Sequence, residues 1–263
     1  MLIATDLDGT LVPYDASEPS AVTAEVLQRV DRAGVPLVFV TARPLRWMDG
    51  FWPHVGRHGM AVVSNGAVVY DVHARRPIAV NGIDPEAGLE VVAAIADALP
   101  GASFAIECLD GLRRDPTFVE RHDVPTGSPV GDLAEIWDVP ALKLLVRHEA
   151  MDPDALRDRT VAAVGDAATA TWSVSGLVEI SASGITKASA LVDLCARLGV
   201  EAADVVAFGD MPNDIPMLRW AGTSYAVTGA HESVVAAADH VAPPVNDDGV
   251  AQVLASLLED GPH

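Results

Sequence analysis

The sequence predicts an α/β fold in which a doubly wound parallel sheet is interrupted by an inserted α+β unit. In the first third of the chain, short apolar strand patterns alternate with helix patterns, and this alternation resumes after Ser183-Gly184. Such alternation is typical of a parallel sheet with helices on both faces. In the middle segment, strand patterns instead flank a hairpin turn, which indicates a separate unit. We therefore expect a core over residues 1–81 and 184–263 and an insert over residues 82–183.

The first third of the chain contains four short apolar runs that we expect to form strands. They lie at residues 2–5, 36–40, 60–63 and 67–70. Apolar residues at helical spacing predict a helix over 20–33 that stops at Gly34, and a second helix is expected over about 44–55. Asn65-Gly66 favours a hairpin between the last two strands.

The insert and the last third follow two different patterns. In the insert we expect helices over 85–99 and 153–164 and strands over 104–106, 142–146, 170–174 and 177–180. The stretch 109–140 is rich in Gly, Pro and Asp and receives no assignment. In the last third we expect a helix ending at Gly199, a buried strand over 204–208, a helix over 213–221, a strand over 225–227 and a closing helix near 248–258.

Composition narrows the classes of function. The chain has 263 residues, a net charge of −20 and an apolar fraction of 50%, which argues against intrinsic disorder and against nucleic-acid or anionic-membrane partners. The two cysteines match neither a disulfide scaffold nor a metal-ligand spacing. No apolar run approaches the roughly 18 residues that span a bilayer, and the first residues lack the basic region of a secretory signal. We therefore expect a cytoplasmic protein. Its oligomeric state is not readable from the sequence.

Polar residues follow three of the predicted core strands, at the edge where α/β sheets bind ligands. The first strand runs into Asp6-Leu7-Asp8-Gly9-Thr10, the second into Thr41-Ala42-Arg43, and the strand over 204–208 into Gly209-Asp210-Met211-Pro212-Asn213-Asp214. Lys187 begins the helix after the insert. Each segment alone has a structural explanation, because Asp-Gly is a common turn and Thr, Asn and Asp often cap helices.

Taken together, these segments predict a site for phosphoryl transfer. Four or more carboxylates at one edge would repel each other unless a cation neutralised them. Oxygen ligands select a hard cation, and Mg²⁺ is the usual choice where a phosphate shares the site. Lys187 and the backbone N–H groups after Asp6 would then hold the phosphate oxygens.

The same segments resemble the four motifs of the haloacid dehalogenase (HAD) superfamily, whose members are mostly Mg²⁺-dependent phosphatases. Residues 6–11 are similar to motif I, Thr41 to motif II, Lys187 to motif III and residues 209–214 to motif IV. Three accessory features point to the Cof-like branch with a class IIB cap: Asn65-Gly66-Ala67, Glu179-Ile180 and Asn246-Asp247-Asp248-Gly249-Val250. Two departures lie near loops that border the site. Ala42 stands where this branch often has Gly, and Thr228-Gly229-Ala230 stands where Gly-Asn-Ala is common.

The resemblance implies a Rossmann-like core, a cap that acts as a lid, and a mechanism. Asp6 would attack the phosphorus to form an aspartyl-phosphate, and Asp8 would act as general acid and then general base. Mg²⁺ would be held by the Asp6 side chain, the Asp8 backbone carbonyl and Asp210, with Asp214 supporting the metal waters or orienting Lys187. Thr41, Lys187 and Asn213 would bind the oxygens of the transferring group. Further substrate-binding candidates are Thr10, Arg43 and Asn65, and Asn246 is a weaker one.

The substrate class and two alternatives remain open. The leading interpretation is a phosphatase acting on a small phosphorylated metabolite, such as a sugar phosphate or a phosphorylated cofactor. A phosphotransferase or mutase of the same superfamily, and a metabolite-binding module without catalysis, are the alternatives. Cationic or polar residues of the insert are candidates for contacting the substrate, although such side chains more often solvate a surface: Arg113, Arg114, Lys143, Arg147 and His148.

Overall fold

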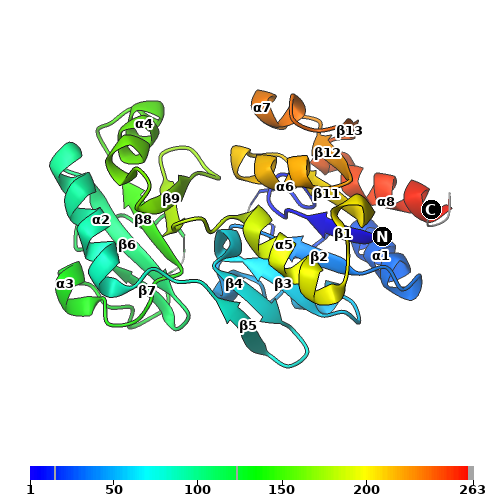
Figure 1. The fold of residues 1–263 in the computed structure, drawn as a ribbon, viewed down its shortest axis with the longest axis horizontal. Helices are drawn as coiled ribbons and strands as arrows, with labels where there is room; N and C mark the ends of the chain where they lie inside the picture. Colours follow the sequence, from blue (N-terminus) through cyan, green and yellow to red (C-terminus); the bar gives the residue numbers. More distant parts are fainter. Residues whose placement is uncertain (15, 123, 260–263) are drawn as a thin grey trace. The chain divides into compact units, whose positions relative to one another are not determined.

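The computed structural model describes residues 1–14, 16–122 and 124–259 (Figure 1). The chain divides into two compact units, one formed by Met1–Ala79 with Thr186–His263 and the other by Val80–Ile185. We call them the core unit and the insert unit. The predicted α/β class is confirmed, because the core unit contains a largely parallel sheet and the insert unit an antiparallel one.

The core sheet has eight strands in the order β13-β12-β11-β1-β2-β3-β4-β5. Their bounds are β1 (Leu2–Thr5), β2 (Leu37–Val40), β3 (Met60–Val63), β4 (Val68–Asp71), β5 (Arg76–Val80), β11 (Val205–Gly209), β12 (Thr223–Val227) and β13 (His240–Ala242). The strands from β13 to β3 are parallel, and β4 returns antiparallel to β3, as the hairpin signal predicted. Thr5 pairs with Phe208 on β11 and with Phe39 on β2, so the chain leaves these three strands at one edge of the sheet.

Helices cover the core sheet because the central strands are buried on both faces. The helices of this unit are α1 (Ala21–Arg32), α5 (Lys187–Leu198), α6 (Ile215–Trp220), α7 (Glu232–Val235) and α8 (Gly249–Glu259). Leu191 and Leu194 of α5 pack in one cluster with Leu2 and Ala4 of β1. Since side chains alternate along a strand, Ile3 points to the opposite face.

The insert unit has a five-stranded sheet in the order β7-β6-β8-β10-β9. Its strands are β6 (Ser103–Cys108), β7 (Gly111–Arg114), β8 (Lys143–Arg147), β9 (Ala168–Thr171) and β10 (Val178–Ala182), and its helices are α2 (Pro85–Ala98), α3 (Leu133–Ile136) and α4 (Pro153–Val164). Apolar side chains of α2 and α4 pack with Ile106 and Leu144 on one face of this sheet.

The helix predicted over residues 44–55 is wrong. The structure has two short 3-10 helices there, η1 (Leu45–Trp47) and η2 (Trp52–His54). Pro53 cannot donate a backbone hydrogen bond inside a helix. At Gly50 a side chain would meet the carbonyl oxygen of Ser17 at 2.0 Å, so only glycine fits where the chain passes this close to residue 17.

Four further 3-10 helices connect elements of the core unit: η3 (Ser64–Gly66), η4 (Ala202–Asp204), η5 (Pro212–Asp214) and η6 (Val245–Asp247). The strand expected over 170–174 is displaced, since β9 ends at Thr171. Within the described ranges, every helix is too short or too polar to cross a membrane.

Candidate active site

The loop after β1 brings the first acidic residues to the carboxyl edge of the sheet. Asp6 stays joined to the sheet, because its backbone N–H donates to Phe208 at 3.1 Å. The N–H groups of Leu11 and Val12 then donate to the carbonyl of Leu7 at 2.9 Å, which closes a compact loop. Gly9 adopts a left-handed φ of 77°, and a side chain there would lie 2.3 Å from an oxygen of Asp210. Glycine is therefore required where this loop meets the end of β11.

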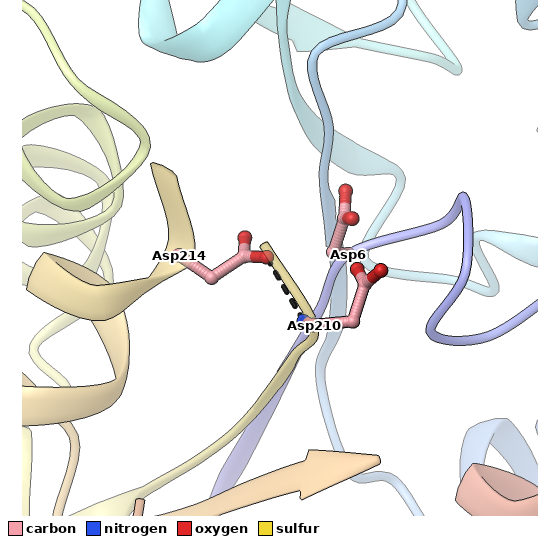
Figure 2. A group of neighbouring side chains, drawn as sticks. All are labelled: Asp6, Asp210 and Asp214. Carbon is pink, nitrogen blue, oxygen red and sulfur yellow. Dashed lines mark hydrogen bonds between the residues drawn. The ribbon is translucent and has the colours of Figure 1, made fainter. Parts of the chain in front are cut away.

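Three buried carboxylates meet at this edge: those of Asp6, Asp210 and Asp214 (Figure 2). One oxygen of each lies within 4.8 Å of the others. Asp214 is fixed by the turn after β11, since its Oδ2 accepts hydrogen bonds from the backbone N–H groups of Asp210 and Met211, both at 3.1 Å. We call these three residues the acidic cluster. Its close oxygen atoms are suitable ligands for a hard divalent cation.

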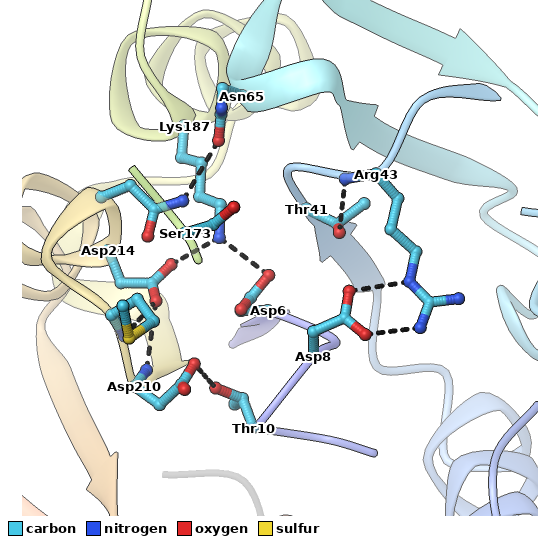
Figure 3. A network of polar contacts seen from close by, with 12 residues as sticks. Asp6, Asp8, Thr10, Thr41, Arg43, Asn65, Ser173, Lys187, Asp210 and Asp214 are labelled. Atoms are coloured by element: carbon cyan, nitrogen blue, oxygen red, sulfur yellow. Dashed lines mark hydrogen bonds and ion pairs between the residues drawn. The ribbon is translucent and has the colours of Figure 1, made fainter. Parts of the chain in front are cut away.

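Lys187 contributes a positive charge to the acidic cluster (Figure 3). Its Nζ lies 2.7 Å from Oδ1 of Asp6 and 2.8 Å from Oδ1 of Asp214, and the side chain is only 1% exposed. The start of α5 is fixed by Thr186 and Ser189, which exchange side-chain and backbone hydrogen bonds. This capping arrangement places Lys187 in the first helical turn.

The acidic cluster carries more negative charge than one lysine can neutralise. Burial raises the pKa of Asp6 well above its ordinary value, Lys187 partly offsets this effect, and Asp214 and Asp210 raise the pKa further. Burial and then Asp214 raise the pKa of Asp210 to about 6. Burial lowers the pKa of Lys187, but Asp214 and Asp6 more than offset it and hold the pKa above its ordinary value. These directions are those expected of buried carboxylates that lie close to one another.

Asp8 lies beside the acidic cluster but has a different partner. Nε and Nη2 of Arg43 donate to its two oxygens at 2.7 and 2.5 Å (Figure 3). Arg43 is itself fixed, because Nη2 also donates to the carbonyl of Ala16 at 2.8 Å and the guanidinium lies 4.7 Å from the centre of the Phe51 ring. The sequence predicted Arg43 as a substrate-binding residue; the structure shows it paired with Asp8, and substrate binding stays a prediction. Its bidentate grip fixes the orientation of the Asp8 carboxylate.

Two asparagines meet on the Lys187 side of the site. Nδ2 of Asn213 donates to Oδ1 of Asn65 at 3.1 Å. Asn65 has a left-handed φ of 57°, a conformation that asparagine tolerates better than most residues. In the described part of the chain, Asn65 Nδ2 and Asn213 Oδ1 are buried without a hydrogen-bond partner. A buried amide with an unused donor is suited to an oxygen-rich ligand.

Other candidates from the sequence have more varied positions. Thr41 is fully buried at the end of β2, where its Oγ1 accepts a hydrogen bond from the backbone of Arg43 at 3.0 Å. Oγ1 of Thr10 donates to Asp210 Oδ1 at 2.8 Å, so Thr10 supports a carboxylate. Asn246 is exposed on η6. Within the insert unit, Lys143 pairs with Glu179, and Arg113 pairs with Asp110 and Asp138.

Sequence reasoning missed Tyr14. Its hydroxyl donates to Asp210 Oδ2 at 2.7 Å, although the side chain is 49% exposed. Burial, followed by Asp210, raises the pKa of Tyr14 above its ordinary value, so the hydroxyl remains a donor at neutral pH. A single tyrosine after a loop motif carries no periodicity or spacing signal that would have identified it.

The fold and this cluster define an α/β enzyme that handles phosphoryl groups. The sequence model of the haloacid dehalogenase-like hydrolases matches residues 3–254, and the chain belongs to this family. The resemblance inferred from the motifs is thereby confirmed.

Relatives and solved structures agree with this assignment. The pyridoxal phosphate phosphatase YbhA of Escherichia coli is 27% identical over 284 residues, covering 98% of each chain. A phosphoglycolate phosphatase of Methanopyrus kandleri is 26% identical and covers 98% of this chain and 97% of its own. The structure of the sugar phosphatase BT4131, of HAD subclass IIB, superposes with a TM-score of 0.81 at 20% identity and covers 97% and 98% of the two chains, which shows the shared fold. The protein is a phosphatase of this superfamily.

Proposed function

We propose that this phosphatase hydrolyses a small phosphorylated metabolite through an aspartyl-phosphate on Asp6 and uses Mg²⁺. The observation that carries the proposal is the environment of Asp6. One of its oxygens is held by Lys187, and its carboxylate lies within reach of Asp210 and Asp214. The substrates named for the relatives are pyridoxal phosphate, phosphoglycolate and sugar phosphates, which supports a sugar phosphate or a phosphorylated cofactor as substrate.

Asp6 is the nucleophile in this proposal, and Asp8 handles the protons. A carboxylate oxygen of Asp6 forms a bond to phosphorus while the bond to the substrate alkoxide breaks, and Asp8 donates a proton to that alkoxide. In the second step of the reaction, Asp8 accepts a proton from water, the water oxygen forms a bond to phosphorus, and the bond between phosphorus and the Asp6 oxygen breaks. The Asp6 carboxylate and free phosphate result. Arg43 fixes the Asp8 carboxylate by donating to both of its oxygens, which supports the proton-accepting part of this role.

The donor set fits a magnesium ion. We propose that the Asp6 side chain, the Asp8 backbone carbonyl and Asp210 hold it. Oδ1 of Asp214 accepts a hydrogen bond from Lys187 at 2.8 Å, and its Oδ2 accepts from two backbone N–H groups of its own turn, which supports a role in orienting Lys187. When bound, the cation supplies positive charge that offsets the repulsion between an anionic nucleophile and an anionic phosphate.

We propose that the oxygens of the transferring group are held by Lys187, Thr41 and Asn213, with Asn65 beside them. The Nδ2 group of Asn65, a donor that is buried without a partner in the described chain, supports this assignment, and Nδ2 of Asn213 uses only one of its two hydrogens on Asn65. Donors fixed in advance stabilise the charge that develops during transfer. The residues proposed for proton transfer, for the cation and for the transferring group all belong to the core unit, which supports residues 1–81 and 184–263 as the catalytic part.

Substitution of the nucleophile tests the proposal. We expect Asp6→Asn to abolish hydrolysis of an aryl phosphate, because an amide cannot form the phosphorylated intermediate. We also expect chelation of divalent ions to abolish hydrolysis by the native enzyme. Asp31→Asn, at an aspartate of α1 that binds Arg57, is the matched control and should retain activity. Turnover by Asp6→Asn at the native rate would refute the nucleophile, and turnover without divalent ions would refute the metal.

A further inference from the structure

Two hydroxyl groups of the loop after β1 hold the Asp210 carboxylate. Thr10 donates to Oδ1 at 2.8 Å, and Tyr14 donates to Oδ2 at 2.7 Å. Asp210 comes from the other end of the chain, at the end of β11, and is only 4% exposed. Both of its oxygens are therefore fixed by a segment that also carries Asp6 and Asp8.

The loop backbone explains how Tyr14 reaches this carboxylate. A side chain at Gly9 would meet an oxygen of Asp210 at 2.3 Å and two ring atoms of Tyr14 at 2.8 Å. The ring and the carboxylate therefore both lie close to the backbone of Gly9. Val12 accepts a hydrogen bond from the N–H of Gly9 at 2.8 Å, which turns the chain back towards the site. The contact of Tyr14 with Asp210 thus depends on the same glycine that closes the loop.

We infer that Tyr14 is a positioning residue that orients Asp210 for the divalent cation. This inference rests on the proposed magnesium site. Without the Tyr14 hydroxyl, Oδ2 of Asp210 would lose its hydrogen-bond donor, and only the bond from Thr10 to Oδ1 would remain. The carboxylate would then rotate more freely. A carboxylate held in its binding orientation loses less freedom when a cation binds, and partners of metal ligands commonly change metal affinity about 10- to 100-fold.

The test is a calorimetric titration of metal-free protein with Mg²⁺. Tyr14→Phe keeps the ring and removes the hydroxyl, and we expect the dissociation constant to rise about 10-fold or more. Tyr70→Phe is the matched control. Tyr70 lies on β4, where its ring stacks on Trp52 with centroids 5.4 Å apart, and this substitution should leave Mg²⁺ affinity unchanged.

Turnover provides a second measurement that a merely structural role would not change in the same way. The loss of turnover in Tyr14→Phe should be largely recovered when the Mg²⁺ concentration is raised, while the substrate KM at saturating Mg²⁺ stays near the native value. Tyr14→His can restore a ring N–H donor and should recover part of the Mg²⁺ affinity. It replaces Tyr14→Phe in the titration if the Phe variant is unstable. If Tyr14→Phe binds Mg²⁺ as tightly as the native protein, or more tightly, the inference is wrong and the proposed function stands. If the native protein binds no Mg²⁺, the proposed metal site and this inference both fail.

Discussion

The core unit and the insert unit each bury a lysine in an ion pair, but the two lysines occupy different kinds of position. Lys187 begins a helix at the carboxyl edge of a parallel sheet and bridges two carboxylates from distant segments, Asp6 and Asp214. Lys143 lies within strand β8, and its Nζ is 2.5 Å from Glu179 on the neighbouring strand β10. Both lysines are at most 5% exposed.

The comparison distinguishes two arrangements of buried charge: charged residues that converge from several segments, and an ion pair between neighbouring strands. A lysine within a strand is bonded across the sheet, where a cross-strand pair stabilises local structure. At the ends of parallel strands, charged residues converge from several segments, and there the ions repel as well as attract. Burial is common to both lysines and does not separate them. The convergence of carboxylates from distant segments on Lys187 is the reason to propose a catalytic role for it and not for Lys143.

The largest effect should come from the insert lysine and should appear in stability. Lys143→Met leaves Glu179 buried without this partner, and we expect the free energy of unfolding to fall by about 3–5 kcal/mol. Urea unfolding of the purified protein measures the change. The double variant Lys143→Met with Glu179→Gln should recover part of the loss. A decrease below about 1 kcal/mol would show that the pair does not stabilise the sheet.

The core lysine should instead act on turnover. We expect Lys187→Met to lower kcat for an aryl phosphate about 10²- to 10³-fold, because the transferring group loses a fixed positive charge. Lys187→Arg should not restore the rate, since the planar guanidinium does not fit a site shaped for one ammonium between two carboxylates. If kcat for Lys187→Met stays within about twofold of native, the contrast between the two lysines is wrong.

The site was more predictable from sequence than its internal contacts. The proximity of Asp6 and Asp210 was predictable because buried parallel strands have a recognisable pattern and their ends meet at one edge. Lys187 was added because it begins the helix after the insert, and the structure places it against Asp6. The pairing of Arg43 with Asp8 was not predicted, because two side chains from neighbouring loops meet only through the tertiary fold. The contact of Tyr14 with Asp210 spans 196 positions and has no local signature.

The fold shows the same limit. Long elements such as α2 and α4 were correctly predicted. The segment 44–55 was predicted as one helix from its general pattern, and Pro53, which cannot donate a backbone hydrogen bond, interrupts such a helix. In the unassigned stretch 109–140, β7 and α3 have only four residues each, too short for a periodic pattern to be recognised.

The pair formed by Arg43 and Asp8 should have a smaller effect on catalysis than Lys187. We expect Arg43→Ala to lower kcat about 10- to 100-fold, because Asp8 loses the orientation needed for proton transfer. Arg43→Lys should restore only part of the rate, since one ammonium cannot grip both oxygens. Arg57→Ala, which removes an exposed partner of Asp31, is the control and should be near native. Equal rates for Arg43→Ala and Arg57→Ala would show that Asp8 does not need this partner.

The smallest effect concerns pH. With its pKa raised to about 6 by burial and by Asp214, Asp210 is protonated more readily in the folded protein than in the unfolded chain, whose ordinary value is 3.8. The metal-free protein therefore loses stability as pH rises from about 4 to about 6. At pH 5, Mg²⁺ competes with a proton for the Asp210 carboxylate, whereas at pH 7.5 it does not. We expect Mg²⁺ to bind about 10-fold more weakly at pH 5 and to raise Tm less there, which thermal unfolding at both pH values measures. In Asp210→Asn this pH dependence should diminish. An equal Tm increase at both pH values in the native protein would show that Asp210 is ionised at pH 5 as well as at pH 7.5.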